Sequence, residues 1–352
     1  MAHRERHSRE WKFSPVNRPK STPASARRLP LAAKISVLAG LLALGGAISL
    51  MVVWNTQVTL PPVLPQPDIP LSELKESESS TSVSQGADAS IPLPTQAPTQ
   101  TKARSQEVRY RILLAVLDPD DNYSSDALIV ANVNCTRRTI DMVSIPRDTY
   151  VETSSRSDRR INGAYGSARD VRRLLNEVKS LLSFVPDYYI IGSLGFVEEL
   201  VDLVGGIDFD IPVKMNSDDL ARGLSIHFEK GMTHLNGRDA VKVLRYRKSY
   251  GDFGRMRTQQ AFVRTYLRKM LSIQNISQLP RLPEIVDRHV DSNLSWGQML
   301  ALAMEMKDID TETGLNSQTL PVVDYTLDGH IRRIMDRPKA SAMLAHIFSN
   351  QR

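Results

Sequence analysis

The densest group of side chains able to do chemistry lies at residues 244–260, where four arginines surround one aspartate. Arg245 and Arg247 would point to one face if this part of the chain is extended, because strand side chains alternate with a period of two. Arg255 and Gln259 are four residues apart and would share a face near the start of a helix. Guanidinium groups match phosphate oxygens, and the amides at a helix start favour anions. The pattern suits a pyrophosphate, and a solvated basic face with ordinary salt bridges fits the spacing equally well.

A second candidate follows the apolar run at residues 139–145. Arg147 comes directly after Pro146, which would end a strand and leave the arginine in a loop. Loops at the carboxyl ends of strands often build the sites of α/β domains. Arg147 is therefore a candidate site residue, although a surface turn in which Arg147 and Asp148 pair with neighbouring residues also explains this sequence.

A pair of carboxylates flanks the turn of a predicted hairpin. Asp118 follows the strand at 112–117, and Asp126 precedes the strand that starts at Ala127. Two such carboxylates could hold one Mg²⁺, which takes oxygen ligands from one or two carboxylates and from the phosphates of a substrate. Aspartates are also common in hairpin turns for conformational reasons, and Asp120 and Asp121 compete for the same role.

Several other classes of site find no support. The seven histidines show no spacing typical of zinc, and no Gly-x-Ser-x-Gly or Walker-type sequence occurs. The single cysteine, Cys135, excludes an intramolecular disulfide. The net charge of +6 is concentrated in the first 34 residues, beside an apolar segment, so we expect no nucleic-acid partner.

The amino-terminal third predicts a membrane anchor and a linker. Residues 35–54 contain no charged side chain, and about 20 apolar residues suffice for a helix to cross a bilayer. Basic residues crowd into the preceding tail, 1–34, which places that tail in the cytoplasm by the positive-inside rule. Residues 55–107 are rich in Pro, Ser and Thr and predict an extracytoplasmic tether with a reach of about 40 Å. The protein is then a single-pass cell-membrane protein whose working domain lies outside the cytoplasm.

Residues 108–352 predict one α/β domain with a mixed central sheet flanked by helices. Its expected strands are 110–117, 127–133, 139–145 and 207–213, each a short run of β-branched and aliphatic residues. Its expected helices are 171–182, 196–204, 254–272, 296–307 and 340–350.

On these residues the chain resembles the LytR-CpsA-Psr family, bacterial enzymes that transfer glycopolymers from a polyprenyl pyrophosphate carrier to peptidoglycan. The motifs that carry the resemblance lie at residues 112–118, 125–126, 143–149, 160–165, 196–206, 234–237 and 245–260. They follow the family's order, after the same arrangement of tail, single helix and linker. The resemblance implies a magnesium-dependent phosphotransferase whose partners are the lipid-linked glycopolymer, the peptidoglycan acceptor and the membrane.

The resemblance also implies a role for each candidate. Asp118 and Asp126 would bind Mg²⁺. The pyrophosphate would be bound by Arg147, Arg160, Arg245, Arg247, Arg255 and Gln259, with Asp252 beside them. Three departures from the family's usual pattern stand out. Val116 replaces a glycine, Ser124 replaces an arginine two residues before the aspartate, and Arg160-Ile-Asn-Gly163 replaces Lys-Ile-Asn-His.

For the reaction we expect a peptidoglycan sugar hydroxyl to attack the phosphorus that bears the glycopolymer, leaving polyprenyl phosphate. Asp252 is the candidate to accept the hydroxyl proton, or it orients Arg245 or Arg247 by pairing, which we prefer because a carboxylate among arginines is a weak base. A magnesium-dependent lipid pyrophosphatase that uses water is the alternative enzyme. A membrane-tethered regulatory or binding protein is the alternative outside enzymes, and the predicted topology speaks against a role on DNA.

Overall fold

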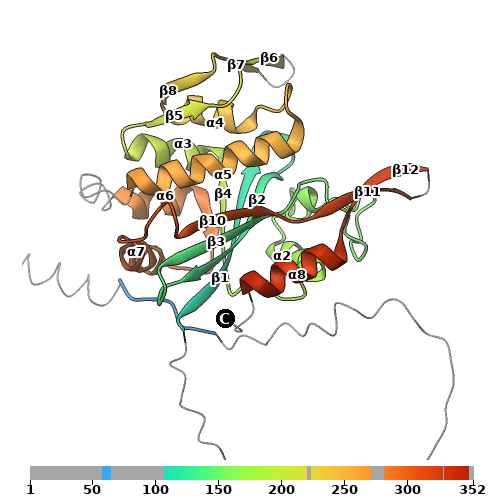
Figure 1. Ribbon diagram of the computed structural model, residues 1–352, viewed down its shortest axis with the longest axis horizontal. Coiled ribbons are helices and arrows are strands. Elements are labelled where there is room, and N and C mark those ends of the chain that lie inside the picture. The colour runs from blue at the N-terminus through green and yellow to red at the C-terminus, as the bar shows by residue number, and fades with distance from the viewer. Residues whose placement is uncertain (1–57, 65–106, 220–222, 271–280, 328, 349–352) are drawn as a thin grey trace, which may run out of the picture. The chain divides into compact units, whose positions relative to one another are not determined.

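The computed structural model describes residues 58–64, 107–219, 223–270, 281–327 and 329–348 (Figure 1). The predicted tail at 1–34 and membrane helix at 35–54 lie outside these residues. Within the described residues, none of the helices has the length and apolar character needed to span a bilayer.

A six-stranded mixed sheet forms the centre of the domain, as the sequence predicts. Its strands are β1 (Arg109–Asp118), β2 (Ser124–Asn134), β3 (Thr139–Ser144), β4 (Tyr188–Ser193), β9 (Val290–Ser292) and β10 (Leu315–Thr319). They lie in the order β10-β3-β2-β1-β4-β9, with β1 parallel to β4 and β3 parallel to β10. Because β2 runs antiparallel to β1 and β3, its first residues lie at the same sheet edge as the ends of those strands. This edge brings the predicted aspartates and Arg147 together.

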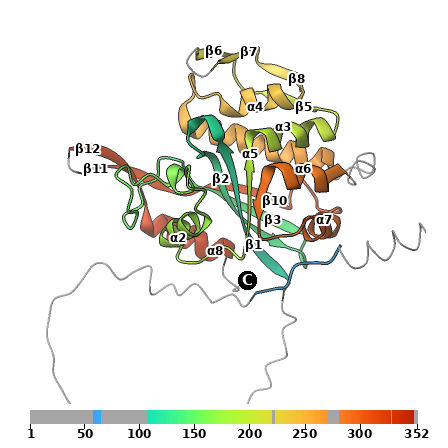
Figure 2. The ribbon, with the colours of Figure 1, turned by 180° about the vertical axis from the view of Figure 1, so that it is seen from behind.

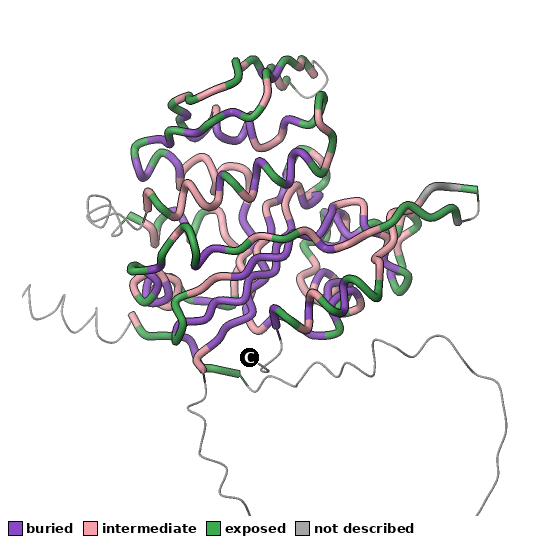
Figure 3. The backbone as a smooth tube through the Cα atoms, in the orientation of Figure 1, coloured by how far each residue is buried: buried purple, intermediate pink, exposed green. Residues whose placement is uncertain are grey.

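Helices cover both faces of this sheet, and the strands run through the buried interior (Figures 1 and 3). On one face, α2 (Val171–Leu182) and α8 (Arg337–Phe348) pack on Leu113 and Val130. On the other face, α7 (Trp296–Glu305) and α5 (Gly251–Met270) pack on the opposite side chains of the same strands. Alternate residues of β1 and β2 therefore belong to two separate cores, as expected for strands buried on both sides.

A smaller layer of helices and hairpins lies beside α5 (Figure 2). It comprises α3 (Leu194–Leu203), β5 (Ile207–Ile211), β6 (Met215–Asp219), β7 (Leu224–Phe228), β8 (Gly231–Leu235) and α4 (Gly237–Arg245). Strand β5 pairs with β8, and β6 pairs with β7. Phe209 meets Phe262 of α5 edge to face at 5.5 Å, which joins this layer to the rest of the domain. Helix α6 (Leu282–His289) packs against α3.

The remaining hairpin, β11 (Val322–Leu327) and β12 (His330–Met335), projects from the domain (Figure 1). Its base is tied to the loop after β3, because Tyr150 donates its backbone N–H to the carbonyl of Arg333 at 2.7 Å. The sequence analysis did not predict this hairpin.

The prediction that Arg245 and Arg247 share an extended segment is wrong. Asn236 caps α4 by accepting a hydrogen bond from the amide of Asp239, and this helix continues to Arg245. Arg247 falls in the turn before α5, which a 2.8 Å hydrogen bond from Gly251 to its carbonyl closes. Gly251 has a φ of +66°, a conformation that glycine adopts without strain.

Part of the predicted linker contacts the domain. Tyr110 and Tyr188 donate hydroxyl hydrogen bonds to the carbonyls of Pro61 and Pro62, at 2.9 and 2.5 Å. Both tyrosines come from the amino-terminal ends of their strands, away from the edge that carries the aspartates. Pro61 and Pro62, which belong to the predicted linker, therefore lie against the domain.

Candidate active site

Asp126 is the centre of the arginine cluster. Its carboxylate accepts a 2.7 Å hydrogen bond from Arg147, and lies 3.4 Å from Arg255 and 3.7 Å from the Nε of Arg245. The ladder between β1 and β2 explains its orientation, because Val116 pairs with Ala127 and Leu117 with Ser125. Asp126 is thus the extra residue of a β-bulge, a device that redirects a side chain out of the regular alternation.

Asp118 ends β1 and is almost inaccessible, at 1% exposure. It accepts a 2.5 Å hydrogen bond from Arg245 and a 3.0 Å hydrogen bond from the backbone N–H of Asp120. Through the second bond, Asp118 caps the 3-10 turn Pro119–Asp121. Arg245 therefore lies between the two predicted metal ligands and pairs with both. A buried carboxylate requires such a partner.

Arg255 enters the cluster from the first turns of α5 and is 2% exposed. Burial lowers the pKa of its guanidinium, and the carboxylates of Asp252 and Asp126 oppose this shift. Asp252 pairs with it at 2.5 Å. The orienting role that we preferred for Asp252 therefore involves Arg255, one helical turn away, rather than Arg245 or Arg247.

Two other predicted pyrophosphate ligands, Gln259 and Arg247, lie beside this group. Gln259 is hydrogen-bonded to the backbone, whereas Arg247 is exposed. Gln259 directs its amide to the carbonyls of Leu244 and Asp126, at 3.2 and 3.4 Å, and so ties α5 to α4 and β2. Arg247 is exposed and makes no ion pair with any residue that the structure describes. It lines a polar hollow of about 540 Å³ together with Arg147, Arg245 and Arg255. The four arginines converge on this hollow although Arg245 and Arg247 do not share a strand.

Arg160 is the predicted ligand that the structure leaves outside the cluster. Its guanidinium is half exposed and pairs with Asp148 at 3.2 Å and Asp158 at 3.5 Å. Asp148 also lies 3.9 Å from Arg333 of β12, which in turn lies 4.0 Å from Asp252. Arg333 therefore borders the cluster, and it was not predicted from the sequence. No motif surrounds it, and only the fold brings this hairpin to α5.

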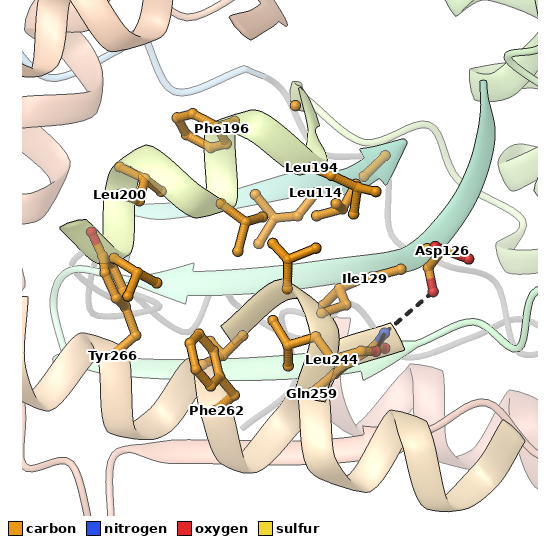
Figure 4. A pocket seen from close by; sticks show the side chains of 18 of the residues that line it. Leu114, Asp126, Ile129, Leu194, Phe196, Leu200, Leu244, Gln259, Phe262 and Tyr266 are labelled. Atoms are coloured by element: carbon orange, nitrogen blue, oxygen red, sulfur yellow. Dashed lines mark hydrogen bonds between the residues drawn. The ribbon is translucent and has the colours of Figure 1, made fainter. Parts of the chain in front are cut away.

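An apolar cavity of about 300 Å³ begins where the charged cluster ends (Figure 4). Leu114 and Ile129 of the sheet, Leu200 of α3 and Phe262 and Tyr266 of α5 line it. Asp126, Arg245 and Gln259 form its polar end. The arrangement suits a ligand with a charged head and a long apolar tail, because each part meets a surface of its own kind.

The two aspartates match Mg²⁺ in ligand type but do not complete its coordination. Asp118 and Asp126 face a shared cationic group, Arg245. In the part of the chain that the structure describes, no cluster of three or more His, Cys, Asp or Glu side chains is placed to hold a metal. A magnesium ion would need phosphate oxygens and water as its other ligands, which is usual for this metal.

Comparisons with known proteins identify the family to which the chain belongs. A model of the LytR_cpsA_psr family matches residues 77–348. The polyisoprenyl-teichoic acid–peptidoglycan teichoic acid transferase TagV of Bacillus subtilis (strain 168) is 32% identical over 198 residues, which are 53% of this chain and 50% of that relative. TagU of Bacillus licheniformis, with the same transferase name, is 30% identical over 222 residues, 62% of this chain and 67% of the relative. The chain thus spans about half the length of the first relative.

A solved structure supports the same grouping. The crystal structure of TagV from Bacillus subtilis superposes with a TM-score of 0.56 at 26% identity, covering 68% of this chain and 96% of that one. The mixed sheet with helices on both faces is therefore shared with it.

Proposed function

This chain belongs to the LytR_cpsA_psr family, and from that premise we propose that it transfers a glycopolymer from a polyprenyl pyrophosphate to peptidoglycan. The observation that carries the proposal is the meeting of two surfaces: the polar hollow lined by arginines and the apolar cavity share Asp126 and Arg245. A pyrophosphate on a prenyl chain would place its head in the first and its tail in the second. The names of TagV and TagU, transferases of polyisoprenyl-linked teichoic acid to peptidoglycan, agree with this substrate class.

In the proposed reaction a sugar hydroxyl of the acceptor forms a new bond to the phosphorus that bears the glycopolymer. The bond from that phosphorus to the bridging oxygen breaks, polyprenyl phosphate leaves with the electron pair, and the proton of the attacking hydroxyl ends on this leaving phosphate. Arg147, Arg245 and Arg255 would leave Asp126 in part to contact the phosphate oxygens. Their positive charges would then stabilise the negative charge that develops on the bridging oxygen.

We further propose that Asp118 and Asp126 hold Mg²⁺ together with the substrate's phosphates. When bound, the ion would neutralise charge on the pyrophosphate oxygens. Asp118 would hold the ion from the end of β1, and Asp126 would hold it from the bulge in β2. The sheet fixes the positions of both residues.

Product analysis tests the proposed function directly. The full chain would be incubated with a lipid pyrophosphate-linked glycopolymer, Mg²⁺ and peptidoglycan. We expect polyprenyl phosphate together with a phosphodiester between glycopolymer and peptidoglycan. Release of free glycopolymer phosphate in the presence of acceptor would instead identify the alternative lipid pyrophosphatase.

The apolar cavity yields a prediction about chain length. Leu200→Trp would add bulk inside a cavity of about 300 Å³ without touching the arginines. We expect the Kd for a long-chain prenyl pyrophosphate to rise at least about tenfold, and the Kd for inorganic pyrophosphate to stay within about threefold. Calorimetric titration measures both, and Leu200→Met, of nearly equal volume, is the control. Unchanged affinity of the tryptophan variant for the long lipid would contradict a tail in this cavity.

The proposed location, a single-pass protein with its catalytic domain outside the cytoplasm, gives a separate prediction. It rests on the charge bias around residues 35–54. A periplasm-type reporter enzyme fused after Arg352 should be active, and the same reporter placed before Met1 should be silent. The opposite pattern would overturn the orientation and, with it, the access of the domain to peptidoglycan.

A further inference from the structure

Two buried polar atoms face each other at the rim of the arginine cluster without hydrogen bonds. They are Nη1 of Arg333 and Oδ2 of Asp252, 4.0 Å apart. Neither atom has a hydrogen-bond partner among the described residues, and Oδ2 of Asp148 lies 3.9 Å from the same Nη1. Asp252 uses its other oxygen, Oδ1, for the ion pair with Arg255. A buried donor and a buried acceptor left unsatisfied are costly. A group that bridges the two atoms would satisfy both of them.

The chemistry of the two atoms restricts what that group can be. Arg333 can only donate and the carboxylate of Asp252 can only accept, so the bridging group must both accept and donate. A hydroxyl does so, whereas a phosphate oxygen without a proton would be repelled by the carboxylate. The gap has room for one such oxygen, because an oxygen about 2.8 Å from each atom, an ordinary hydrogen-bond distance, can bridge two atoms 4.0 Å apart.

The surroundings hold both atoms in place. The guanidinium of Arg333 lies over the ring of Phe253 at 5.2 Å, and its Nε lies 3.6 Å from Asp324 on the neighbouring strand. Asp252 pairs with Arg255, and Arg255 in turn pairs with Asp126, which lines the polar hollow. These ion pairs connect the gap to that hollow. A hydroxyl held there would be next to the phosphorus rather than in the apolar cavity.

We propose that Arg333 and Asp252 together bind the acceptor's sugar hydroxyl, with Arg333 donating to its oxygen and Asp252 accepting from its O–H group. This inference rests on the proposed function, and it assigns to the β11–β12 hairpin the task of orienting the nucleophile. Arg333 is then a residue that acts on the acceptor, whereas the other four arginines act on the donor.

The test separates acceptor from donor kinetics. Arg333→Gln should lower kcat/KM for the peptidoglycan acceptor by about 10- to 100-fold, while the Kd for a short-chain lipid pyrophosphate changes less than about threefold. Arg333→Lys, which keeps one donor and the charge, should recover part of the loss. Arg332→Gln is the matched control, because it removes the same charge from the adjacent residue, which lies over Tyr150 on the opposite face of β12.

Each outcome decides the matter. Normal acceptor kinetics in both Arg333 variants, or equal losses in Arg333→Gln and Arg332→Gln, would overturn the inference while wild-type transfer still supports the proposed function. A matching loss of donor affinity would also overturn it, since Arg333 would then bind the donor. A wild-type protein that binds the lipid but attaches no glycopolymer would overturn the proposed function itself, and the hydroxyl site with it.

Discussion

Replacing Arg245 with lysine should lower turnover of a short-chain lipid pyrophosphate by about thirty- to a thousandfold, or roughly 2–4 kcal/mol in the transition state. Lysine keeps the positive charge but loses the planar fork that lets Arg245 reach both Asp118 and Asp126. The melting temperature should fall as well, because Asp118 is 1% exposed and would keep a weaker partner. Steady-state kinetics and thermal unfolding of the same samples give the two readouts.

Arg247→Lys is the companion variant, since Arg247 lines the same hollow but is exposed. Its melting temperature should match that of the wild type, and its turnover should still fall if the guanidinium clamps phosphate. A solvated arginine would change stability by less than about 1 kcal/mol and would leave the rate almost untouched. Unchanged turnover in both variants would leave the cluster a structural basic face and remove the proposed site.

Asp126→Asn should abolish magnesium-dependent turnover, with a loss of at least about a hundredfold. The variant separates two roles of this carboxylate, because Asp126 is both a proposed metal ligand and the shared counter-charge of Arg147, Arg245 and Arg255. Without it the three guanidinium groups repel one another and should bind inorganic pyrophosphate at least as tightly as in the wild type. Titrations with and without Mg²⁺ should then show that the ion strengthens pyrophosphate binding only in the wild type.

Asp120→Asn is the control for that prediction, because Asp120 is an exposed aspartate in the same turn. Its turnover and its response to Mg²⁺ should remain normal, and circular dichroism should show native spectra for both variants. Loss of the magnesium response in Asp120→Asn, with a normal response in Asp126→Asn, would move the metal assignment to the turn.

Hydrophobic periodicity was enough to predict the centre of the fold. The first three strands and the helix at 171–182 have apolar residues at the spacing of their own secondary structure, and the structure confirms all four. The placement of Asp118 and Asp126 on either side of one hairpin turn also followed from those strands. The bulge that turns Asp126 toward the arginines was not predictable, because it depends on the register between two strands.

The sequence around Arg245 did not predict the short helix α4, because this helix carries many polar residues. Only one side of helix α4 is buried. Its last residue, Arg245, points into the domain because it pairs with Asp118, and the apolar spacing of the helix does not predict this orientation. Arg333 lay beyond prediction for a different reason. It acts through a contact between a carboxy-terminal hairpin and α5, and nothing in the neighbouring sequence marks that long-range contact.

The docked prolines change what the linker can do. If residues 35–54 cross the membrane, only residues 55–60 separate the bilayer from Pro61, a span of at most about 20 Å. Because residues 65–106 follow the docked prolines in the chain, adding residues to that stretch would not lengthen the connection between residue 54 and Pro61.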